Sequence, residues 1–388
     1  MKKTFKVIID TDPGVDDTNA LVYVMNDPQF DIKLFTISNG NINLDKATRN
    51  MCHLLDLFHK DTPVVKGLKK RFGGNTEDAT FLHTKEGLGG YVPPKTTVTQ
   101  PQKKDVADAM YEVLKANPKE ITVIVLGPHT NFAYLLQKHP DAKDLVKDVL
   151  MMGGAPMGIA ANPNHNSFNI RTDAPAFKQT IDSALPITMC PSSIGRDEGY
   201  FSKEHVEEIK NTNDLGKFLD KTFETYWEPE YNKTRIATND LSAIYYLPHP
   251  KLYKTKSADI EVDIKTGKTT AHFKRKGQFK IVVGLKRKKF IKLMLEKLKN
   301  MSDIKIPELY VATASKQKTQ KKTTGTPVTK TTKSKTAAKA PTQKASTKTK
   351  TQTQKSNEKT TKTSTTKTAA KKQTETAEKK PQAQKSNK

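Results

Sequence analysis

The chain has 388 residues, a formal net charge of +26 and 35% apolar residues, and these averages combine two unlike parts. Residues 311–388 contain 21 Lys, three Glu and neither Arg nor Asp, so they carry +18 and leave +8 for residues 1–310. The same segment lacks Phe, Tyr, Trp, Leu, Ile and Met. It therefore cannot bury enough apolar area to offset a chain entropy of about 1–2 kcal/mol per residue. We expect a folded α/β domain at 1–310 and a disordered, basic Lys/Thr-rich tail at 311–388.

Several classes of protein are excluded by what the sequence lacks. No stretch approaches the ~18 consecutive apolar residues of a membrane span, and the N-terminus lacks the long apolar run of a signal peptide. Two cysteines, Cys52 and Cys190, offer neither a disulfide framework nor a CxxC metal site. We expect a cytoplasmic, non-secreted protein, and the tail leaves a nuclear or nucleic-acid-associated location open.

Strands and helices are predicted to alternate through the first half of the chain. The expected strands are 5–9, 32–38, 121–126, 146–152 and 186–190, and the expected helices are 17–27, 44–58, 130–138 and 174–184. Residues 197–247 are mainly helical in pattern, followed by short strands at 258–264, 269–274 and 279–284 and a basic helix at 286–299. This order favours an open, mostly parallel sheet flanked by helices on both faces. Ligands of such sheets bind at the carboxyl ends of the strands.

The sharpest local signal follows the first strand, where Asp10-Thr11-Asp12-Pro13-Gly14-Val15-Asp16-Asp17 places four carboxylates within eight residues. Like charges this close repel unless a cation neutralises them or some are protonated, and hard divalent cations prefer oxygen ligands. Helix capping would explain one or two of the four. An alternative is the Asp-based phosphatase pattern DxDx[TV], which Asp10 and Asp12 fit. Gly14 breaks that pattern, and Asp16 and Asp17 have no role in it.

Several motifs in order resemble the inosine-uridine preferring nucleoside hydrolases. Residues 7–21 (VIIDTDPGVDDTNAL) are similar to the N-terminal signature of that family, and residues 83–90 (HTKEGLGG) to its HGxxGLGG loop. Residues 126–131, 151–154 and 168–169 are similar to its LTN, MxGG and EFN motifs. The resemblance covers about residues 5–300. It implies an open α/β fold and hydrolysis of the N-glycosidic bond of ribonucleosides to ribose and free base, using a Ca²⁺-bound water.

The resemblance also implies roles for individual residues. It gives Asp12, Asp17, the Thr130 carbonyl and Asp240 as Ca²⁺ ligands, with Asp12 as general base and Asp10 orienting the ligands. Asp16, Asn41, Asn169 and Met152 would surround the ribose. On the base side the chain offers His83, Tyr226, Trp227 and Tyr231, with Asn239 next to the metal ligand Asp240. His129 and His165 are expected to be ordinary loop histidines. The family further implies a homo-oligomer.

Three positions depart from the family pattern. Asn239 stands where the family has a His, and an amide cannot act as a general acid. Ser167 replaces the Glu of EFN, and an apparent insertion leaves Asn162, Asn164 and Asn166 as substitutes for a displaced Asn. An alternative function is therefore a catalytically impaired relative that binds ribosyl ligands or serves as a scaffold.

The tail has a separate expected role. Its Lys-rich, aromatic-free composition suits non-specific binding of nucleic acid or another polyanion, and an equally plain alternative is a solvated, solubilising extension.

Overall fold

A nine-stranded sheet forms the centre of the computed structural model, which describes residues 3–301 and 306. Its order is β10-β9-β11-β6-β5-β4-β1-β2-β3. The strands are β1 (Phe5–Thr11), β2 (Phe30–Ile37), β3 (Val64–Lys66), β4 (Thr122–Val125), β5 (Asp148–Met152), β6 (Ile187–Cys190), β9 (Tyr253–Val262), β10 (Thr269–Phe273) and β11 (Phe279–Leu285). All neighbours from β3 to β11 pair in parallel, and β9 and β10 add an antiparallel edge.

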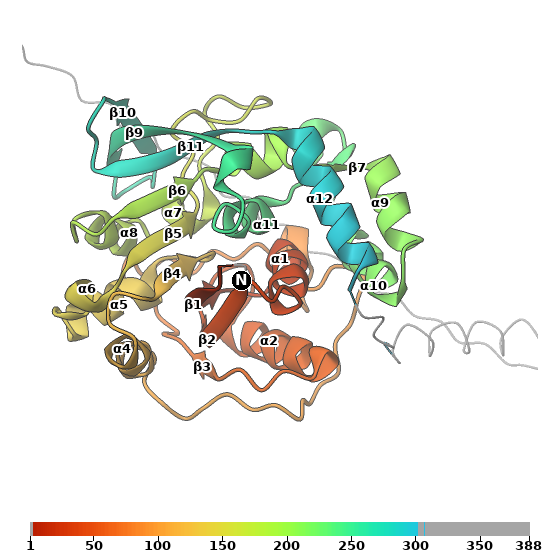
Figure 1. Ribbon diagram of the computed structural model, residues 1–388, viewed down its shortest axis with the longest axis horizontal. Coiled ribbons are helices and arrows are strands. Elements are labelled where there is room, and N and C mark those ends of the chain that lie inside the picture. The colour runs from red at the N-terminus through yellow and green to blue at the C-terminus, as the bar shows by residue number, and fades with distance from the viewer. Residues whose placement is uncertain (1–2, 302–305, 307–388) are drawn as a thin grey trace, which may run out of the picture. The chain divides into compact units, whose positions relative to one another are not determined.

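Helices cover both faces of this sheet, as Figure 1 shows. On one face lie α1 (Val15–Met25), α2 (Leu44–Phe58), α9 (Lys203–Lys210), α10 (Asp214–Phe223), α11 (Asn239–Ile244) and α12 (Arg287–Lys299). On the other lie α4 (Val106–Ala116), α5 (Thr130–Lys138), α6 (Ala142–Leu145) and α8 (Ala174–Ile181). The side chains of β1 alternate between the two cores, with Val7 and Ile9 in the first and Ile8 in the second. Two buried faces explain why the middle of β1, Val7–Ile9, is continuously apolar.

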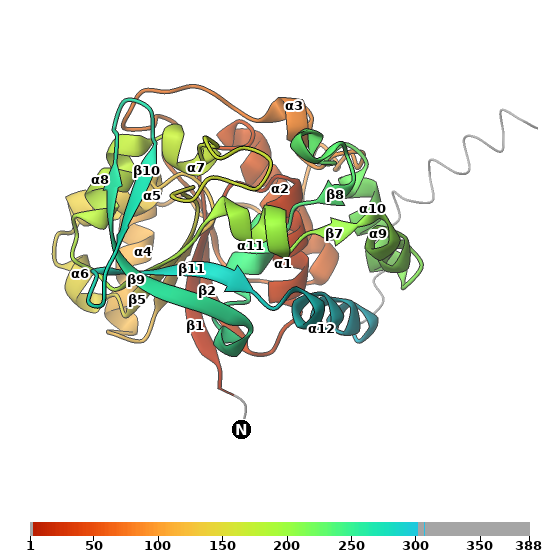
Figure 2. The same ribbon diagram turned by 90° about the horizontal axis from the view of Figure 1, so that it is seen from above.

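Short elements occur in the segments that connect these strands and helices. They are α3 (Thr80–His83), α7 (Phe168–Arg171), the helical turns η1 (Ile194–Glu198), η2 (Pro229–Tyr231) and η3 (Pro250–Leu252), and the antiparallel pair β7 (Phe201–Ser202) and β8 (Arg235–Ile236). Seen from above, α3 and α7 lie beyond the carboxyl end of β1 (Figure 2). They therefore stand at the edge where a parallel sheet binds its ligands.

The predicted fold class is confirmed by this arrangement. The edge strand β3, which has only three residues, and α4, which follows a long irregular segment, were absent from the prediction, as were the short elements α3, α6, α7, β7 and β8. The strand expected at 258–264 instead starts at Tyr253 and ends at Val262. Among the described residues, no helix combines the length and the apolar character needed to cross a bilayer. The tail expected at 311–388 and the domain boundary before it lie outside the described residues, so both stay predictions.

Candidate active site

A cavity of about 340 Å³ opens at the carboxyl edge of the sheet. Its walls come from segments far apart in the sequence, including α1, α3, α7, η1 and α11. Eight residues predicted for the site line it: Asp16, Asn41, His83, Met152, Asn169, Tyr226, Asn239 and Asp240. The structure thus brings together most of the predicted set.

Asp12 lies buried beneath this cavity. Its Oδ2 accepts a hydrogen bond of 2.7 Å from the backbone N–H of Asn41, which fixes the carboxyl group. Its Oδ1 is buried and has no hydrogen-bond partner in the part of the chain that the structure describes. The loops after β2 and β4 close around it: a Cβ on Gly40 would lie 1.8 Å from Oδ2, and one on Gly127 would lie 2.5 Å from Oδ1. Burial, with the nearby charge of Asp17, raises the pKa of Asp12 well above its usual value.

The other carboxylates gather next to Asp12. Oxygens of Asp16, Asp17 and Asp240 all lie within 4.8 Å of one another. Burial raises the pKa of Asp17 to about 6, with the charge of Asp16 adding to it, and the pKa of Asp240 is raised by burial and by Asp16, Asp17 and Asp12. These carboxylates offer oxygen donors only, which fits a hard divalent cation that would relieve the repulsion among them.

Asp17 also organises the loop that precedes α1. One oxygen accepts hydrogen bonds from the Thr11 hydroxyl (2.5 Å) and the Asp12 N–H (3.1 Å). The other accepts from the side-chain amide of Asn41 at 2.8 Å. Asn41 therefore contacts both carboxylates, one through its backbone and one through its side chain. This arrangement joins the loop after β2 to the loop after β1.

His83 reaches the same region from α3. Its Nδ1 accepts a hydrogen bond of 3.0 Å from the backbone N–H of Val15. Because that N–H can only donate, Nδ1 carries no proton and the neutral ring carries its proton on Nε2. Burial lowers the pKa of His83, and its ring packs against Tyr226 with centroids 5.1 Å apart. The structure therefore presents a neutral imidazole beside an aromatic ring on the cavity wall.

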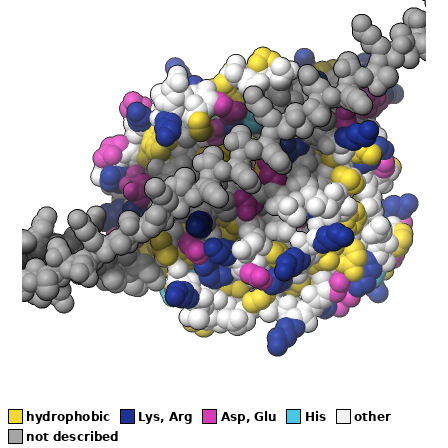
Figure 3. Space-filling view, turned by 180° about the vertical axis from the view of Figure 1, so that it is seen from behind, with side chains coloured by type: hydrophobic (Ala, Val, Ile, Leu, Met, Phe, Trp, Pro, Cys, Tyr) yellow, Lys and Arg dark blue, Asp and Glu magenta, His cyan; other side chains and the backbone are white. Residues whose placement is uncertain are grey.

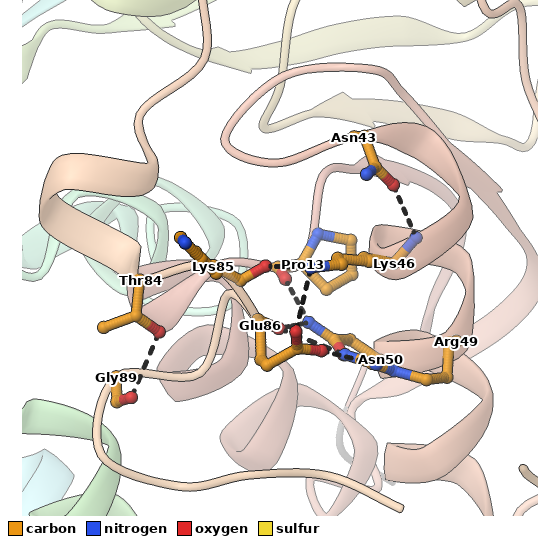
Figure 4. Close-up of polar contacts among 9 residues, drawn as sticks. All are labelled: Pro13, Asn43, Lys46, Arg49, Asn50, Thr84, Lys85, Glu86 and Gly89. Atoms are coloured by element: carbon orange, nitrogen blue, oxygen red, sulfur yellow. Dashed lines mark hydrogen bonds and ion pairs between the residues drawn. The ribbon is translucent and has the colours of Figure 1, made fainter. Parts of the chain in front are cut away.

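The loop after His83 is anchored to α2, as Figure 4 shows. Asn50 is buried, and its side-chain amide donates to the carbonyls of Pro13 (3.1 Å) and Glu86 (2.9 Å). The Glu86 carboxylate pairs with Lys46 and Arg49 at 2.8 and 2.7 Å. Asn50 thus links the acidic loop after β1 to the loop that follows His83.

Asn169 and Met152 form another part of the wall. The Asn169 amide donates to the carbonyl of Leu126 at the end of β4 and lies 3.4 Å from the Met152 sulfur. On the opposite side, the amide of Asn239 donates to Asp16 at 3.2 Å. Two amides and a carboxylate consequently border the cavity next to the acidic cluster.

Four further predicted residues, Asp10, Thr130, Trp227 and Tyr231, do not line the cavity. Asp10 is fully buried, accepts from Thr36 (2.5 Å) and Asn131 (2.8 Å), and does not line the cavity. The Thr130 hydroxyl donates to Asp173 at 2.6 Å. The hydroxyl of Tyr231 donates to Asp197, and the Arg235 guanidinium lies 4.0 Å from the centre of its ring. Neither Tyr231 nor Trp227, which packs partly buried against the core, is in the cavity wall.

Some cavity residues were missed by the sequence reasoning. They include His165, Arg196 and Glu228, while Asn166 is the one of the three Asn substitutes that lines the cavity. His165 and His129 were both expected to be ordinary loop histidines. His165 lines the cavity, whereas His129 does not. His129 is buried, and its Nδ1 contacts the Thr180 hydroxyl. Arg196 lies just before the segment 197–247, and Glu228 lies within it. The sequence of that segment showed only a helical pattern. No local signal could have paired them, because 31 residues separate them in the sequence.

Comparison with known proteins agrees with this geometry. The model of the family described as "Inosine-uridine preferring nucleoside hydrolase" matches residues 7–292. The chain belongs to this family. It is 31% identical over 263 residues to the non-specific ribonucleoside hydrolase RihC of Salmonella newport, covering 68% of this chain and 85% of RihC.

Solved structures of other nucleoside hydrolases have the same fold. The plant nucleoside hydrolase PpNRh1 superposes with a TM-score of 0.70 at 26% identity, covering 76% of this chain and 99% of that one. A purine-preferring ribonucleoside hydrolase from Gardnerella vaginalis gives a TM-score of 0.69 at 23% identity, covering 76% and 98%. As a nucleoside hydrolase, the chain is an enzyme that hydrolyses ribonucleosides.

Proposed function

We propose that this nucleoside hydrolase cleaves the N-glycosidic bond with a Ca²⁺ ion held by Asp12, Asp17, Asp240 and the Thr130 carbonyl, and with Asp12 as general base. The observation that carries the proposal is the cluster of carboxylate oxygens of Asp16, Asp17 and Asp240, with the buried Oδ1 of Asp12, which has no hydrogen-bond partner among the described residues. Such an ion, when bound, orients a water molecule and makes it more acidic.

Asp12 is suited to accept the proton of the attacking water. Its Oδ2 already accepts a hydrogen bond from the Asn41 N–H. The proton of the water is therefore accepted by a free lone pair of Oδ1. Loss of the base leaves positive charge on the sugar, and the carboxylates of Asp16 and Asp240 on the cavity wall stabilise that charge.

The ribose is held by the polar residues around this cluster. The Asp16 carboxylate accepts hydrogen bonds from ribose hydroxyls, and the amides of Asn41 and Asn169 complete the contacts. Met152 packs against the sugar ring. His83 and Tyr226 border the base, where the Nε2 proton of His83 serves as a hydrogen-bond donor.

The geometry does not favour the Asp-based phosphatase alternative. A phosphatase of that type needs Asp10 as a nucleophile facing its substrate. Asp10 is fully buried, and one of its oxygens is engaged by Thr36 and Asn131. Its pKa is raised to about 7 by burial, which suits a positioning role beneath the ligands.

A nucleoside panel tests the proposed function. Because RihC is described as non-specific, we expect ribose release from both purine and pyrimidine nucleosides, such as inosine and uridine. Excess chelator should abolish release, and added Ca²⁺ should restore it. No ribose from any nucleoside, with Ca²⁺ demonstrably bound, would instead support the impaired, ribosyl-binding alternative suggested by Asn239 and Ser167.

A further inference from the structure

Glu228 is a buried carboxyl group in the wall of the cavity, with 1% of its side chain exposed. Its backbone is held firmly. The N–H donates to the Arg235 carbonyl and the carbonyl accepts from the Lys233 N–H, both at 3.0 Å. The adjacent Trp227 forms a β-bridge with Ile236. The position of the carboxyl group is therefore fixed relative to the cavity.

The two oxygens of Glu228 have different environments. Oε2 lies 2.5 Å from Nη1 of Arg196, whereas Oε1 is buried and has no hydrogen-bond partner among the described residues. A guanidinium group can only donate, so Oε2 must accept. A proton on this carboxyl group therefore resides on Oε1, where no group in the described part of the chain competes for it.

Burial and nearby charges set the pKa of Glu228 and so decide whether that proton is present. Burial is the largest influence and raises the pKa of Glu228 to about 7. Arg196 and Arg235 lower it, while Glu230 and Asp16 raise it. Glu228 lines the same cavity as Asp16, the carboxylate that we assign to the ribose.

The aromatic and imidazole groups on the cavity wall are poor acids at neutral pH. Burial raises the pKa of the Tyr226 phenol well above its usual value. It lowers the pKa of His165 to about 4, so that imidazole is neutral. His83 is neutral as well, since its Nδ1 accepts from Val15 and burial lowers its pKa. Asn239 has no acidic proton.

We propose that Glu228 is the general acid of the reaction and passes its Oε1 proton to a nitrogen of the departing base. The inference rests on the proposed function. The C1′–N bond breaks with its electron pair remaining on the nitrogen, which Glu228 protonates. A bond forms between C1′ and the water oxygen, and the proton of that water goes to Asp12. Glu228 is left as a carboxylate paired with Arg196, and solvent restores both protonation states.

The test compares two substrates in the full-length protein. Inosine requires protonation of its leaving base, whereas p-nitrophenyl β-riboside releases a stable phenolate without a proton. For Glu228→Gln, which keeps the size and the contact with Arg196, inosine turnover should fall by about 10²–10⁴-fold. Turnover of the nitrophenyl riboside should stay near wild type. Glu230→Gln is the matched control, because Glu230 binds the same Nη1 of Arg196 at 2.7 Å but is 36% exposed.

A pH profile of the wild type gives a second test that needs no variant. Glu228 is protonated below its pKa, so kcat/KM for inosine should fall as the pH rises through about 7. The profile for the nitrophenyl riboside should lack this alkaline limb.

The outcomes separate this proposal from the proposed function. Three results would overturn the role of Glu228 alone. They are an equal loss of turnover for both substrates in Glu228→Gln, wild-type inosine turnover in that variant, and a wild-type pH profile for inosine without the alkaline limb. A wild type that hydrolyses neither substrate would reject the proposed function and this proposal with it.

Discussion

At the residue scale, Asp12 is completely buried, and one of its carboxylate oxygens has no hydrogen-bond partner among the described residues. Asp12→Asn preserves the shape and the contact with the Asn41 N–H but removes the base. We expect nucleoside turnover to fall by about 10²–10⁴-fold, while thermal unfolding shows a folded protein. Asp45→Asn is the matched control, because Asp45 is an exposed residue paired with Lys66. Comparable losses of turnover in the two variants would contradict the role of Asp12.

The carboxylate cluster should also respond to the cation itself. In a chelator-treated sample the buried charges of Asp12, Asp17 and Asp240 repel one another, and a bound Ca²⁺ removes that repulsion. Ca²⁺ at 100 times its Kd should raise the free energy of unfolding by about 2.7 kcal/mol. Calorimetry or a thermal-shift titration measures this, and Asp240→Asn should reduce the shift. An unchanged shift in that variant would remove Asp240 from the ligand set.

Residues differed in how far the sequence could place them. Asp12, Asp16 and Asp17 are close in sequence, and a turn at Pro13-Gly14 is enough to predict that they share a site. Glu228 and Arg196 meet only because the segment around β8 returns to η1. Tyr231 was predicted for the base side, but its contacts with Asp197 and Arg235 hold it outside the cavity wall. Side-chain partners of this kind depend on tertiary packing and leave no local pattern.

At the element scale, the regular alternation of strand and helix predicted the sheet because buried parallel strands are almost continuously apolar. α4 was overlooked although its signal was present: the Asp105 side chain accepts from the N–H groups of Ala107 and Asp108, as an N-cap does. β3 has three residues, too few for a periodic pattern. The contacts of Asn50 with two distant loops were equally invisible, since a buried Asn in a helix has no characteristic spacing.

The anchoring of the His83 loop to α2 predicts a separable effect on binding. Asn50→Ala removes the side-chain donor to the Pro13 carbonyl and leaves the Glu86 carbonyl with Arg49 alone, which should cost about 1–3 kcal/mol of unfolding free energy. It should also raise the KM for nucleosides, because both loops border the site. Denaturant unfolding and steady-state kinetics measure these effects.

Glu86→Ala serves as the control for Asn50→Ala. It removes ion pairs that are partly exposed and worth about 0–1 kcal/mol, and it leaves the backbone carbonyl of Glu86 bonded to Asn50. A larger loss of stability or binding in Glu86→Ala than in Asn50→Ala would show that the ion pairs, and not Asn50, hold the loop.

At the scale of the whole molecule, the net charge of +26 does not describe the catalytic domain. Residues 1–310 carry +8 and the tail carries +18. On the face seen in Figure 3, Lys and Arg side chains are scattered among acidic and uncharged ones. The acidic cluster at the site is consistent with a small-molecule enzyme, and we expect any affinity for polyanions to reside in the tail. Homo-oligomerisation, which the family resemblance implies, stays a prediction.

Truncation after Tyr310 tests whether the tail binds polyanions independently of catalysis. The last described helix, α12, ends at Lys299, so every described helix and strand remains in the truncated chain. We expect the full chain to bind duplex DNA or RNA with an affinity that falls steeply with salt, because binding releases counterions from the phosphates. The truncated chain should lose this binding and keep the same kcat/KM for inosine. Electrophoretic mobility shifts at several salt concentrations measure the first effect, and ribose release measures the second. Equal nucleic-acid binding by the two chains would place the polyanion site in the folded domain instead.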